Sequence, residues 1–273
     1  TTTLKIAVNT RLLLPDKLEG IGWVAYETLK RITVAHPEHE FYFIFDRKWD
    51  ERFIFSDNIT PLAVPPQARH PFLYYLWFEW TIPHILRKIG ADLFLSPDAY
   101  LSLRSSVPSI PVFHDLNFEH YPADLPLLER KYYRYFFPRY ARKATRVVTV
   151  SEFSKRDIIN QYKVPEEKIS VVYNGVNEDF KPVTEEVKAQ TRAELTGGHP
   201  YFIFVGALHP RKNLARLFHA FDYFKQAHTN DIKLLIVGNK KYWTRDIQRA
   251  YEGMQHPGEV VFSGRLPSDT LRR

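Results

Sequence analysis

Short runs of β-branched and aromatic residues alternate along the chain with longer amphipathic stretches, and this alternation constrains the fold more than any other feature. The short runs have the composition of buried strands, and the longer stretches have the apolar spacing of helices. Strands that alternate with helices are typical of parallel sheets joined by crossover helices, so the sequence predicts an α/β protein. The expected strands are Leu4–Val8, Phe41–Phe45, Asp92–Leu95, Ile110–Phe113, Arg146–Val150, Ile169–Val172, Tyr201–Val205, Ile232–Val237 and Val260–Phe262, and helices are expected near 22–35, 73–89, 126–143, 152–162, 213–228 and 242–254.

The segment Tyr173–Pro200 interrupts this alternation. It begins with the turn dipeptide Asn174-Gly175, continues as a polar stretch and ends in two glycines before the next expected strand. The charge changes at the same place, because residues 181–273 hold 15 of the 38 Lys and Arg but only 9 of the 31 Asp and Glu. We therefore expect two domains, residues 1–178 and 179–273. Only three strands are expected in the second, fewer than the five or six usual in a doubly wound sheet, so we expect that domain to be incomplete.

Composition excludes several classes of protein. Hydrophobic residues make up 44% of the chain and charged residues 25%, which is typical of a folded globular protein and excludes disorder. The chain has no cysteine, which excludes disulfides, a thiolate nucleophile and cysteine-bound zinc. No apolar run approaches the roughly 18 residues that span a bilayer, and the first residues lack the pattern of a secretory signal. A cytoplasmic protein is expected.

Two glycines, Gly20 and Gly22, follow the first expected strand. The sequence from Gly20 to Ala25 fits a loose dinucleotide-binding pattern, but eleven residues separate Val8 from Gly20, and that pattern needs the glycines directly after the strand. The glycines still precede an expected helix, whose free N–H groups favour an anion. An anion site and a simple loop-to-helix turn both remain open here.

His114 and Asp115 come directly after the expected strand Ile110–Phe113. This places them at the carboxyl edge of a parallel sheet, where such folds bind ligands. His114 is suited to hydrogen-bond a substrate hydroxyl, with Asp115 setting its tautomer, and a purely structural pair is equally compatible with the pattern. Neither a third ligand for His114 and His120 nor an Asp-x-Asp motif occurs, so no metal site is predicted.

Arg211 and Lys212 lie between the strand Tyr201–Val205 and an expected helix that begins near Asn213. Guanidinium and ammonium groups both bind phosphate oxygens, and the helix N-terminus adds partial positive charge. We expect Asn213 to cap this helix. The P-loop pattern is absent from the chain, and two cations of an ordinary solvated loop remain the competing interpretation.

Taken together, these motifs resemble those of the retaining GT-B glycosyltransferases of group 1, which include bacterial mannosyl- and glucosyltransferases of polysaccharide synthesis. The resemblance extends from Leu4 to Arg265, and the order and spacing of its short motifs make it specific. Its carriers are Gly20-Ile21-Gly22, Phe113–Asp115, Val148–Ser154, Tyr173–Asn177, Val205–Asn213, Ile236–Gly238 and Val261–Gly264.

The resemblance implies two Rossmann-like domains, the second incomplete, that bind a nucleotide-sugar. It assigns catalytic roles to His114, Asp115, Arg211 and Lys212, and donor binding to Gly20, Gly22, Gly206, Arg211, Lys212, Gly238, Gly264 and Arg265. His114 would contact the donor sugar, and Arg211 and Lys212 would hold the diphosphate. The chain departs from the family at Ala207, where arginine is frequent, and at Asn177, where aspartate is frequent. The family's glutamate pair, eight positions apart, would lie beyond Arg273, so we expect this chain to be weakly active or inactive.

The function implied is metal-independent transfer of a sugar, with retention, from a donor of the GDP-mannose or UDP-hexose type to a hydroxyl acceptor in polysaccharide or glycolipid synthesis. No cofactor is implied beyond this substrate. The family mechanism is a front-face attack in which the leaving diphosphate accepts the acceptor's proton. Two alternatives stay open: a sugar-nucleotide epimerase or phosphorylase on the same fold, and a basic module that binds nucleic acid or a membrane. We favour an enzyme that does not bind nucleic acid.

The segment Glu129–Arg146 combines seven basic residues with one acidic residue and six aromatic ones. Such a helix can lie on anionic lipid, which would suit a lipid-linked acceptor and a peripheral position at the inner face of the plasma membrane. A domain helix with its aromatic side chains inward and its cations outward is the interpretation we favour. The aromatic run from Phe72 to Trp80 is likewise expected to be a buried helix face rather than a sugar platform.

Overall fold

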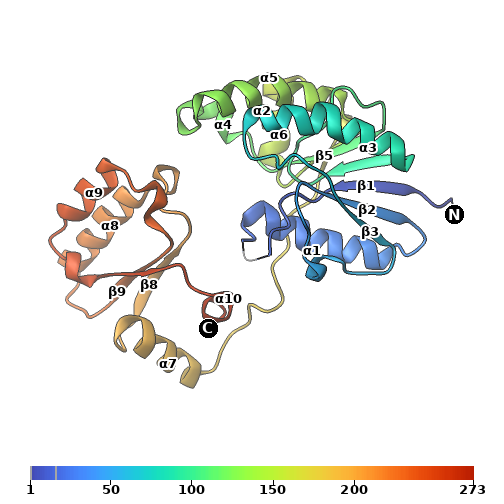
Figure 1. Cartoon of the computed structure of the whole chain (residues 1–273). Coiled ribbons are helices and arrows are strands. Elements are labelled where there is room, and N and C mark those ends of the chain that lie inside the picture. Colours follow the sequence, from blue (N-terminus) through green and yellow to red (C-terminus); the bar gives the residue numbers. More distant parts are fainter. Residues whose placement is uncertain (1, 16) are drawn as a thin grey trace. The chain divides into compact units, whose positions relative to one another are not determined.

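The structure is a computed structural model that describes residues 2–15 and 17–273. The chain forms two compact units, Thr1–Gly175 (unit 1) and Val176–Arg273 (unit 2), each with its own sheet and core (Figure 1). Both units have the α/β architecture that the alternation predicts.

Unit 1 is built on a parallel sheet of seven strands in the order β3-β2-β1-β4-β5-β6-β7. Every neighbouring pair in this sheet is parallel, so the carboxyl ends of the strands share one edge. The strands are β1 (Lys5–Asn9), β2 (Glu40–Phe45), β3 (Ile59–Ala63), β4 (Leu93–Ser96), β5 (Ser109–Phe113), β6 (Val147–Thr149) and β7 (Ile169–Val171).

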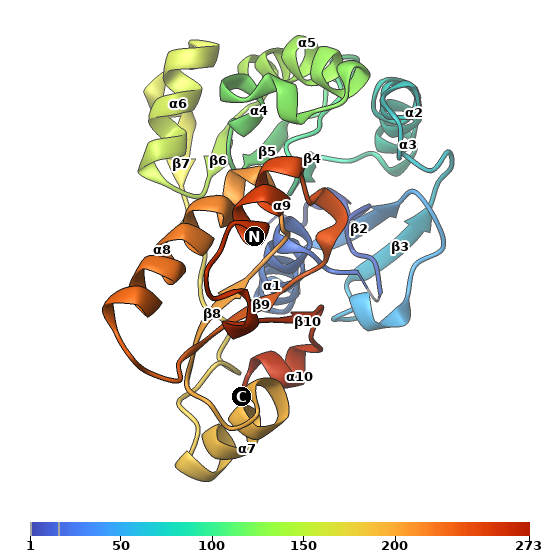
Figure 2. The ribbon, with the colours of Figure 1, turned by 90° about the vertical axis from the view of Figure 1, so that its left-hand side faces the viewer.

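Helices cover both faces of this sheet. The helix α1 lies on one face, and α2, α3 and α5 lie on the other (Figures 1 and 2). Two separate apolar clusters match these layers: one packs Leu29 of α1 against Phe41 and Phe43, and the other joins Trp77 and Tyr140 on the opposite face. The helical segments are α1 (Gly20–Ala35), η1 (Glu51–Phe53), α2 (Pro71–Leu76), the π-helical η2 (Trp77–Thr81), α3 (Ile82–Ile89), α4 (Asn117–His120), η3 (Pro122–Asp124), α5 (Leu127–Lys143), α6 (Glu152–Tyr162) and η4 (Glu166–Lys168).

The two aromatic segments of unit 1 behave differently. In α5 the rings of Tyr132, Phe137 and Tyr140 are buried while the cations point outward, as favoured from the sequence. The run Phe72 to Trp80 has a buried face, which includes Trp77 and Phe78, as the sequence predicts, but the two end residues of the run are exposed.

Unit 2 holds a parallel sheet of three strands in the order β10-β9-β8. Phe218 and Phe221 of α8 pack against Leu234 and Ile236 of β9 to form its core. Its elements are α7 (Glu185–Thr196), β8 (Tyr201–Val205), η5 (Pro210–Lys212), α8 (Leu214–Ala227), β9 (Lys233–Val237), η6 (Lys240–Tyr242), α9 (Arg245–Glu252), η7 (Pro257–Glu259), β10 (Val260–Gly264) and α10 (Ser268–Leu271).

Two elements were not expected from the sequence. The edge strand β3 contains Pro61 and is only half-buried, so its pattern resembles a loop. The helix α7 is polar and lies in the segment interpreted as a linker, although Thr184 caps its start and Gly197 ends it in the left-handed conformation.

Candidate functional site

The three strands of unit 2 all end in glycine at the carboxyl edge of the sheet. Gly206, Gly238 and Gly264 come at the ends of β8, β9 and β10, and all three have positive φ. The N–H of Gly206 donates to the carbonyl oxygen of Val237 at 2.9 Å, and the N–H of Gly238 donates to that of Gly264 at 2.9 Å. The structure therefore brings together, at one edge of the sheet, three of the glycines that the resemblance assigns to donor binding.

A side chain at Gly238 would break this arrangement. A Cβ atom built there would lie 1.9 Å from the carbonyl oxygen of Gly206, and the φ of Gly238 is +152°. Backbone from two neighbouring strands can approach this closely only where a side chain is absent. The glycine at 238 therefore allows the backbone at the ends of β8 and β9 to lie in direct contact.

The loop after β8 is held by His209 rather than by Asn213. The ring nitrogen Nδ1 of His209 accepts from the backbone N–H of Arg211 at 3.2 Å, which starts the short helix η5. Asn213 adopts the left-handed conformation and makes no side-chain cap, so its expected role as a helix cap was wrong. The reason is that η5 occupies the three residues before Asn213, so Asn213 ends η5 in the left-handed conformation.

The three loops after these strands are strongly basic. They carry Arg211 and Lys212 after β8, Lys240 and Lys241 after β9, and Arg265 after β10. All five residues are exposed, and within the described part of the chain none of them forms an ion pair with a carboxylate. No Asp or Glu occurs in residues 206–213, 238–244 or 264–267. The carboxyl edge of unit 2 is therefore an uncompensated positive surface, which favours a multiply charged anion.

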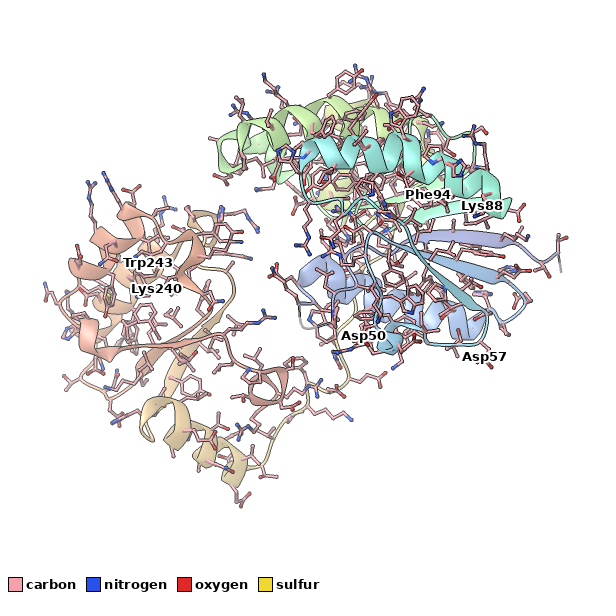
Figure 3. The ribbon with its side chains drawn as sticks, viewed as in Figure 1. Asp50, Asp57, Lys88, Phe94, Lys240 and Trp243 are labelled. Atoms are coloured by element: carbon pink, nitrogen blue, oxygen red, sulfur yellow. The ribbon has the colours of Figure 1, made fainter. Side chains whose placement is uncertain are left out.

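Two of the five cations rest on aromatic rings. The Nζ of Lys240 lies 4.7 Å from the ring centroid of Trp243 and 4.3 Å from that of Phe262, and Figure 3 shows Lys240 and Trp243 side by side. The Nζ of Lys241 lies 5.2 Å from the ring of Tyr242. Sequence reasoning did not single out this loop, although the pair of lysines directly after Gly238 could have indicated it.

The carboxyl edge of unit 1 holds His114, Asp115, Gly20 and Gly22. The Nε2 of the half-buried His114 lies 2.8 Å from the carbonyl oxygen of Pro97. A carbonyl only accepts, so Nε2 carries the proton and Nδ1 of the neutral ring is the acceptor. Asp115 instead accepts from the N–H of Asn117 at 3.0 Å. The expectation that Asp115 sets the tautomer of His114 was therefore wrong, and Pro97 has that role.

Gly20 and Gly22 occupy the first turn of α1, which begins at Gly20. A Cβ atom at Gly22 would lie 3.1 Å from the carbonyl oxygen of Leu12 and 3.2 Å from a methyl group of Leu18, whereas Gly20 faces open space. Gly22 is therefore needed for the close packing of the preceding loop, and Gly20 leaves the helix N-terminus uncovered.

A buried polar network that sequence reasoning missed braces the loop that contains Pro97. The Nδ2 of Asn9 donates to Oδ1 of Asp98 at 2.7 Å and to Oγ of Ser96 at 3.0 Å. The Nε of Arg11 donates to Oδ2 of Asp98 at 2.8 Å. Asp98 thus joins the ends of β1 and β4 and fixes the loop that orients His114.

Arg11 is held as a buried cation. Its guanidinium lies 4.3 Å from the ring centroid of Tyr100 and 5.3 Å from that of Tyr74. Burial opposes the charge, but the Asp98 carboxylate and the surrounding tyrosines hold the pKa of Arg11 well above its ordinary value. The only sequence signal for this pair was that each residue comes shortly after a strand, Arg11 after β1 and Asp98 after β4.

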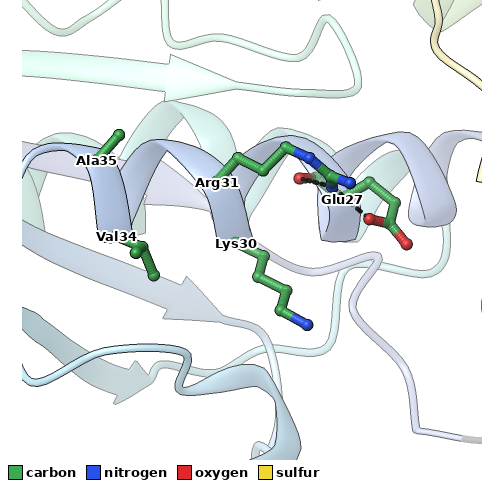
Figure 4. Close-up of a pocket in the computed structure, with 5 residues that line it drawn as sticks. All are labelled: Glu27, Lys30, Arg31, Val34 and Ala35. Atoms are coloured by element: carbon green, nitrogen blue, oxygen red, sulfur yellow. Dashed lines mark hydrogen bonds and ion pairs between the residues drawn. The ribbon is translucent and has the colours of Figure 1, made fainter. Parts of the chain in front are cut away.

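Two other features lie away from these edges. A shallow hollow on α1 is lined by Glu27, Lys30, Arg31, Val34 and Ala35, and Arg31 is paired there with Glu27 (Figure 4). His36, Glu38 and His39 cluster in the turn before β2 and include neither His114 nor His120. Among the described residues, no helix is both long and apolar enough to cross a membrane.

Comparison with known proteins identifies two family domains. Residues 19–180 match Glycosyltransferase Family 4, and residues 186–273 match Glycosyl transferases group 1. The first match alone covers more than half of the chain.

Individual relatives agree with this assignment. The chain is 26% identical over 216 residues to the O-antigen chain mannosyltransferase RfbU of Salmonella typhimurium, which covers 79% of this chain and 56% of that protein. It is 21% identical over 265 residues to the O-antigen chain mannosyltransferase B of Escherichia coli, covering 93% of this chain and 69% of that protein. The chain thus spans only part of the length of these relatives.

A solved structure shares the fold. Anabaena HepE in complex with UDP-glucose matches 98% of this chain and 70% of its own length, with a TM-score of 0.68 and 14% identity. The parallel sheets of both units and the two consecutive family domains lead to one assignment: the chain belongs to the GT-B glycosyltransferases, with a family 4 domain followed by a group 1 domain.

Proposed function

We propose that the protein transfers a sugar from a nucleotide diphosphate donor to a hydroxyl acceptor in the synthesis of a cell-surface polysaccharide. The observation that carries this proposal is the set of five cations at the glycine-lined carboxyl edge of unit 2, none of which has a carboxylate partner among the described residues. A diphosphate carries concentrated negative charge that would compensate these cations, and guanidinium and ammonium groups are suited to its oxygens. The two family domains support the same conclusion.

Arg211 and Lys212 are the cations best suited to the leaving group. Neither is engaged by a carboxylate or an aromatic ring among the described residues. Both belong to η5, and only Asn213 separates η5 from α8, whose N-terminus adds partial positive charge. As the bond from the anomeric carbon to the diphosphate oxygen breaks, negative charge grows on that oxygen. Fixed cations there stabilise the transition state more than the ground state.

The same oxygen can serve as the base. In a retaining front-face transfer, the acceptor hydroxyl forms the new bond to the anomeric carbon while its proton passes to the departing diphosphate. This proton transfer needs neither a protein base nor a metal ion. His114 has its Nδ1 lone pair available for a sugar hydroxyl, because Pro97 holds the proton on Nε2.

The names of the two O-antigen relatives favour a mannose donor. Both O-antigen relatives are named mannosyltransferases, whereas HepE was solved with UDP-glucose. We propose a GDP-mannose or UDP-hexose donor, and a saccharide acceptor that is lipid-linked and presented at the inner face of the plasma membrane.

A thermal-shift panel of UDP, GDP and ADP with their sugars tests the donor. A nucleotide present at 100 times its dissociation constant adds about 2.7 kcal/mol of stability, so the true donor raises Tm clearly above the others. Transfer to a saccharide acceptor is then measured with and without EDTA, and the proposal predicts equal rates. Conversion of the nucleotide-sugar without any acceptor would instead indicate an epimerase, and tight DNA binding that fades with salt would indicate a nucleic-acid module.

A further inference from the structure

One side of unit 1 exposes several aromatic rings. Phe72 and Trp80 are 64% and 54% exposed at the two ends of the α2–η2 segment, and Tyr135 is 52% exposed on α5. Figures 1 and 2 both show α2, α3 and α5 on the same side of the sheet. We call the surface formed by Phe72, Tyr75, Trp80, Arg104, Tyr135 and Arg139 the outer face.

Direct contacts link the helices and the loop that carry the outer face. Tyr75 of α2 lies 6.2 Å from Phe136 of α5, measured between ring centroids, and Phe136 lies 4.8 Å from Tyr135. At the other end, the Nζ of Lys143 donates to the carbonyl oxygen of Ser105 at 2.5 Å, which joins the end of α5 to the loop that carries Arg104. The surface therefore spans two helices and one loop.

The π-helical segment η2 places two of these rings on one side. Phe72 and Trp80 are eight residues apart, and a regular α-helix would rotate Trp80 away from Phe72 by about 80°. A π turn holds more residues than an α turn and so reduces this rotation. Trp77 and Phe78 stay buried in the core while Trp80 remains exposed.

Cations accompany the exposed rings. The guanidinium of Arg104 lies 3.7 Å from the ring centroid of Trp80, and that of Arg139 lies 3.7 Å from that of Tyr135. Along the whole of α5 the only acidic residue is Glu129, whereas Lys131, Arg139 and Arg142 are exposed. The outer face is therefore both aromatic and positively charged.

We infer that the outer face docks the protein on a bilayer that contains anionic lipid. Aromatic rings with polar partners are stable at the level of the lipid headgroups, and exposed arginines and lysines pair with the headgroup phosphates. Leu127 and Leu128 are each more than half exposed at the start of α5. Burying these apolar side chains in a bilayer is favourable, whereas contact with a nucleic-acid backbone does not bury them in apolar surroundings. This inference deepens the proposed function, since it rests on it for the lipid-linked acceptor, but the docking itself is measured without any sugar.

The charged part is tested by co-sedimentation with vesicles of phosphatidylcholine that contain or lack phosphatidylglycerol. Arg104→Gln with Arg139→Gln removes two charges from the outer face, and each charge changes partitioning about fivefold, so the pair weakens binding to the anionic vesicles about 25-fold. The matched control, Lys30→Gln with Lys48→Gln, removes two exposed charges elsewhere in unit 1 and leaves binding nearly unchanged.

The apolar part is tested in the same assay. Phe72→Ser with Trp80→Ser lowers partitioning about tenfold or more, because two exposed rings no longer enter the interface. The control Phe153→Ser with Tyr223→Ser removes two rings that are at least as exposed and leaves partitioning unchanged. All four variants change exposed side chains, and an unchanged Tm verifies their folding.

A quenching measurement reports the orientation directly. Brominated lipids quench tryptophan fluorescence at short range, so the wild-type protein loses emission on binding and Trp80→Phe loses much less while it still binds. Equal quenching in Trp80→Phe, or equal partitioning of the outer-face and control variants, would overturn the docking surface, as would wild-type binding to DNA in preference to vesicles. If vesicle binding follows the outer face but no sugar is transferred, the proposed function fails and the docking surface stands.

Discussion

The carboxyl edges of the two sheets have opposite electrostatic character. At the edge of unit 1, charge is buried and compensated, because Arg11 and Asp98 pair with each other and Asn9 satisfies the second carboxylate oxygen. At the edge of unit 2, the cations Arg211, Lys212 and Arg265 are exposed and lack an acidic partner among the described residues. The carboxyl edge of the sheet in unit 1 therefore has its charge balanced by the protein itself. The corresponding edge in unit 2 carries positive charge that an anionic ligand can balance.

This difference indicates how the two edges work. A buried network holds its geometry before any ligand arrives, which suits the fixed placement of His114 through the Pro97 carbonyl. Exposed cations with no partner gain most from a ligand that carries negative charge, which suits a diphosphate. We therefore expect substitutions at the edge of unit 1 to affect stability and those at the unit 2 cations to affect binding.

The largest expected effect is at Asp98. Asp98→Ala leaves the Arg11 guanidinium buried without its carboxylate, which costs about 3–5 kcal/mol of unfolding free energy. Urea unfolding measures this loss. The double variant Arg11→Met with Asp98→Ala is expected to lose less than the sum of its parts, because the unpaired charge is gone. A loss below about 1 kcal/mol in the single variant would show that the pair is solvated rather than buried.

Next in size is Gly238→Ala. The new methyl group would collide with the carbonyl of Gly206, and alanine is strained at a φ of +152°, so we expect a loss of about 2–4 kcal/mol together with loss of nucleotide binding. Thermal unfolding gives the first quantity. Gly20→Ala is the matched control, because nothing lies within 4 Å of that position and its stability is expected to hold. Equal stability of the two variants would refute the close approach of β8 and β9.

The smallest effect is a pH dependence at Glu79. This carboxylate is buried in unit 1 and accepts from the N–H of Leu103 at 3.0 and 3.1 Å. Burial raises its pKa above the ordinary 4.5, against the opposing hydrogen bonds from Leu103 and Arg104. The folded protein therefore binds this proton more tightly than the unfolded chain, so the stability it contributes is present below pH 4.5 and declines as pH rises through the raised pKa.

Glu79→Gln removes this decline. Urea unfolding across a pH series measures the free energy of unfolding of the wild-type protein and of Glu79→Gln. As the pH increases above 4.5, the wild-type protein is expected to lose stability relative to Glu79→Gln. A difference that stays constant with pH would show that Glu79 titrates normally.

Much of the fold could be predicted from the sequence because it follows from hydrophobic pattern. The strand Tyr201–Val205 and the helix Glu152–Tyr162 have the bounds expected from their residues. The strand β3 escaped because its edge position leaves it half exposed, and α7 escaped because a polar helix has little periodic apolar signal.

The site could be predicted only where residues are neighbours in sequence. Gly206, Arg211 and Lys212 follow one strand and stand out together. Arg11 and Asp98, in contrast, are separated by 87 residues and meet only when β1 and β4 pair. The partner of His114 was missed for a related reason. It is the backbone carbonyl of Pro97, and every residue has such a carbonyl, so the residue type gives no indication of this hydrogen bond.

Isothermal titration calorimetry of GDP and UDP with the wild-type protein, Arg211→Ala and Lys212→Ala tests the central claim most directly. A charge-assisted contact to phosphate contributes about 1.5–3 kcal/mol, so each substitution is expected to weaken diphosphate binding about tenfold to a hundredfold, while stability stays within about 0.5 kcal/mol. Lys188→Ala, which replaces a half-buried lysine on α7 of the same unit, is the control and keeps wild-type affinity. Unchanged nucleotide affinity in both Arg211→Ala and Lys212→Ala would contradict a diphosphate site at this edge.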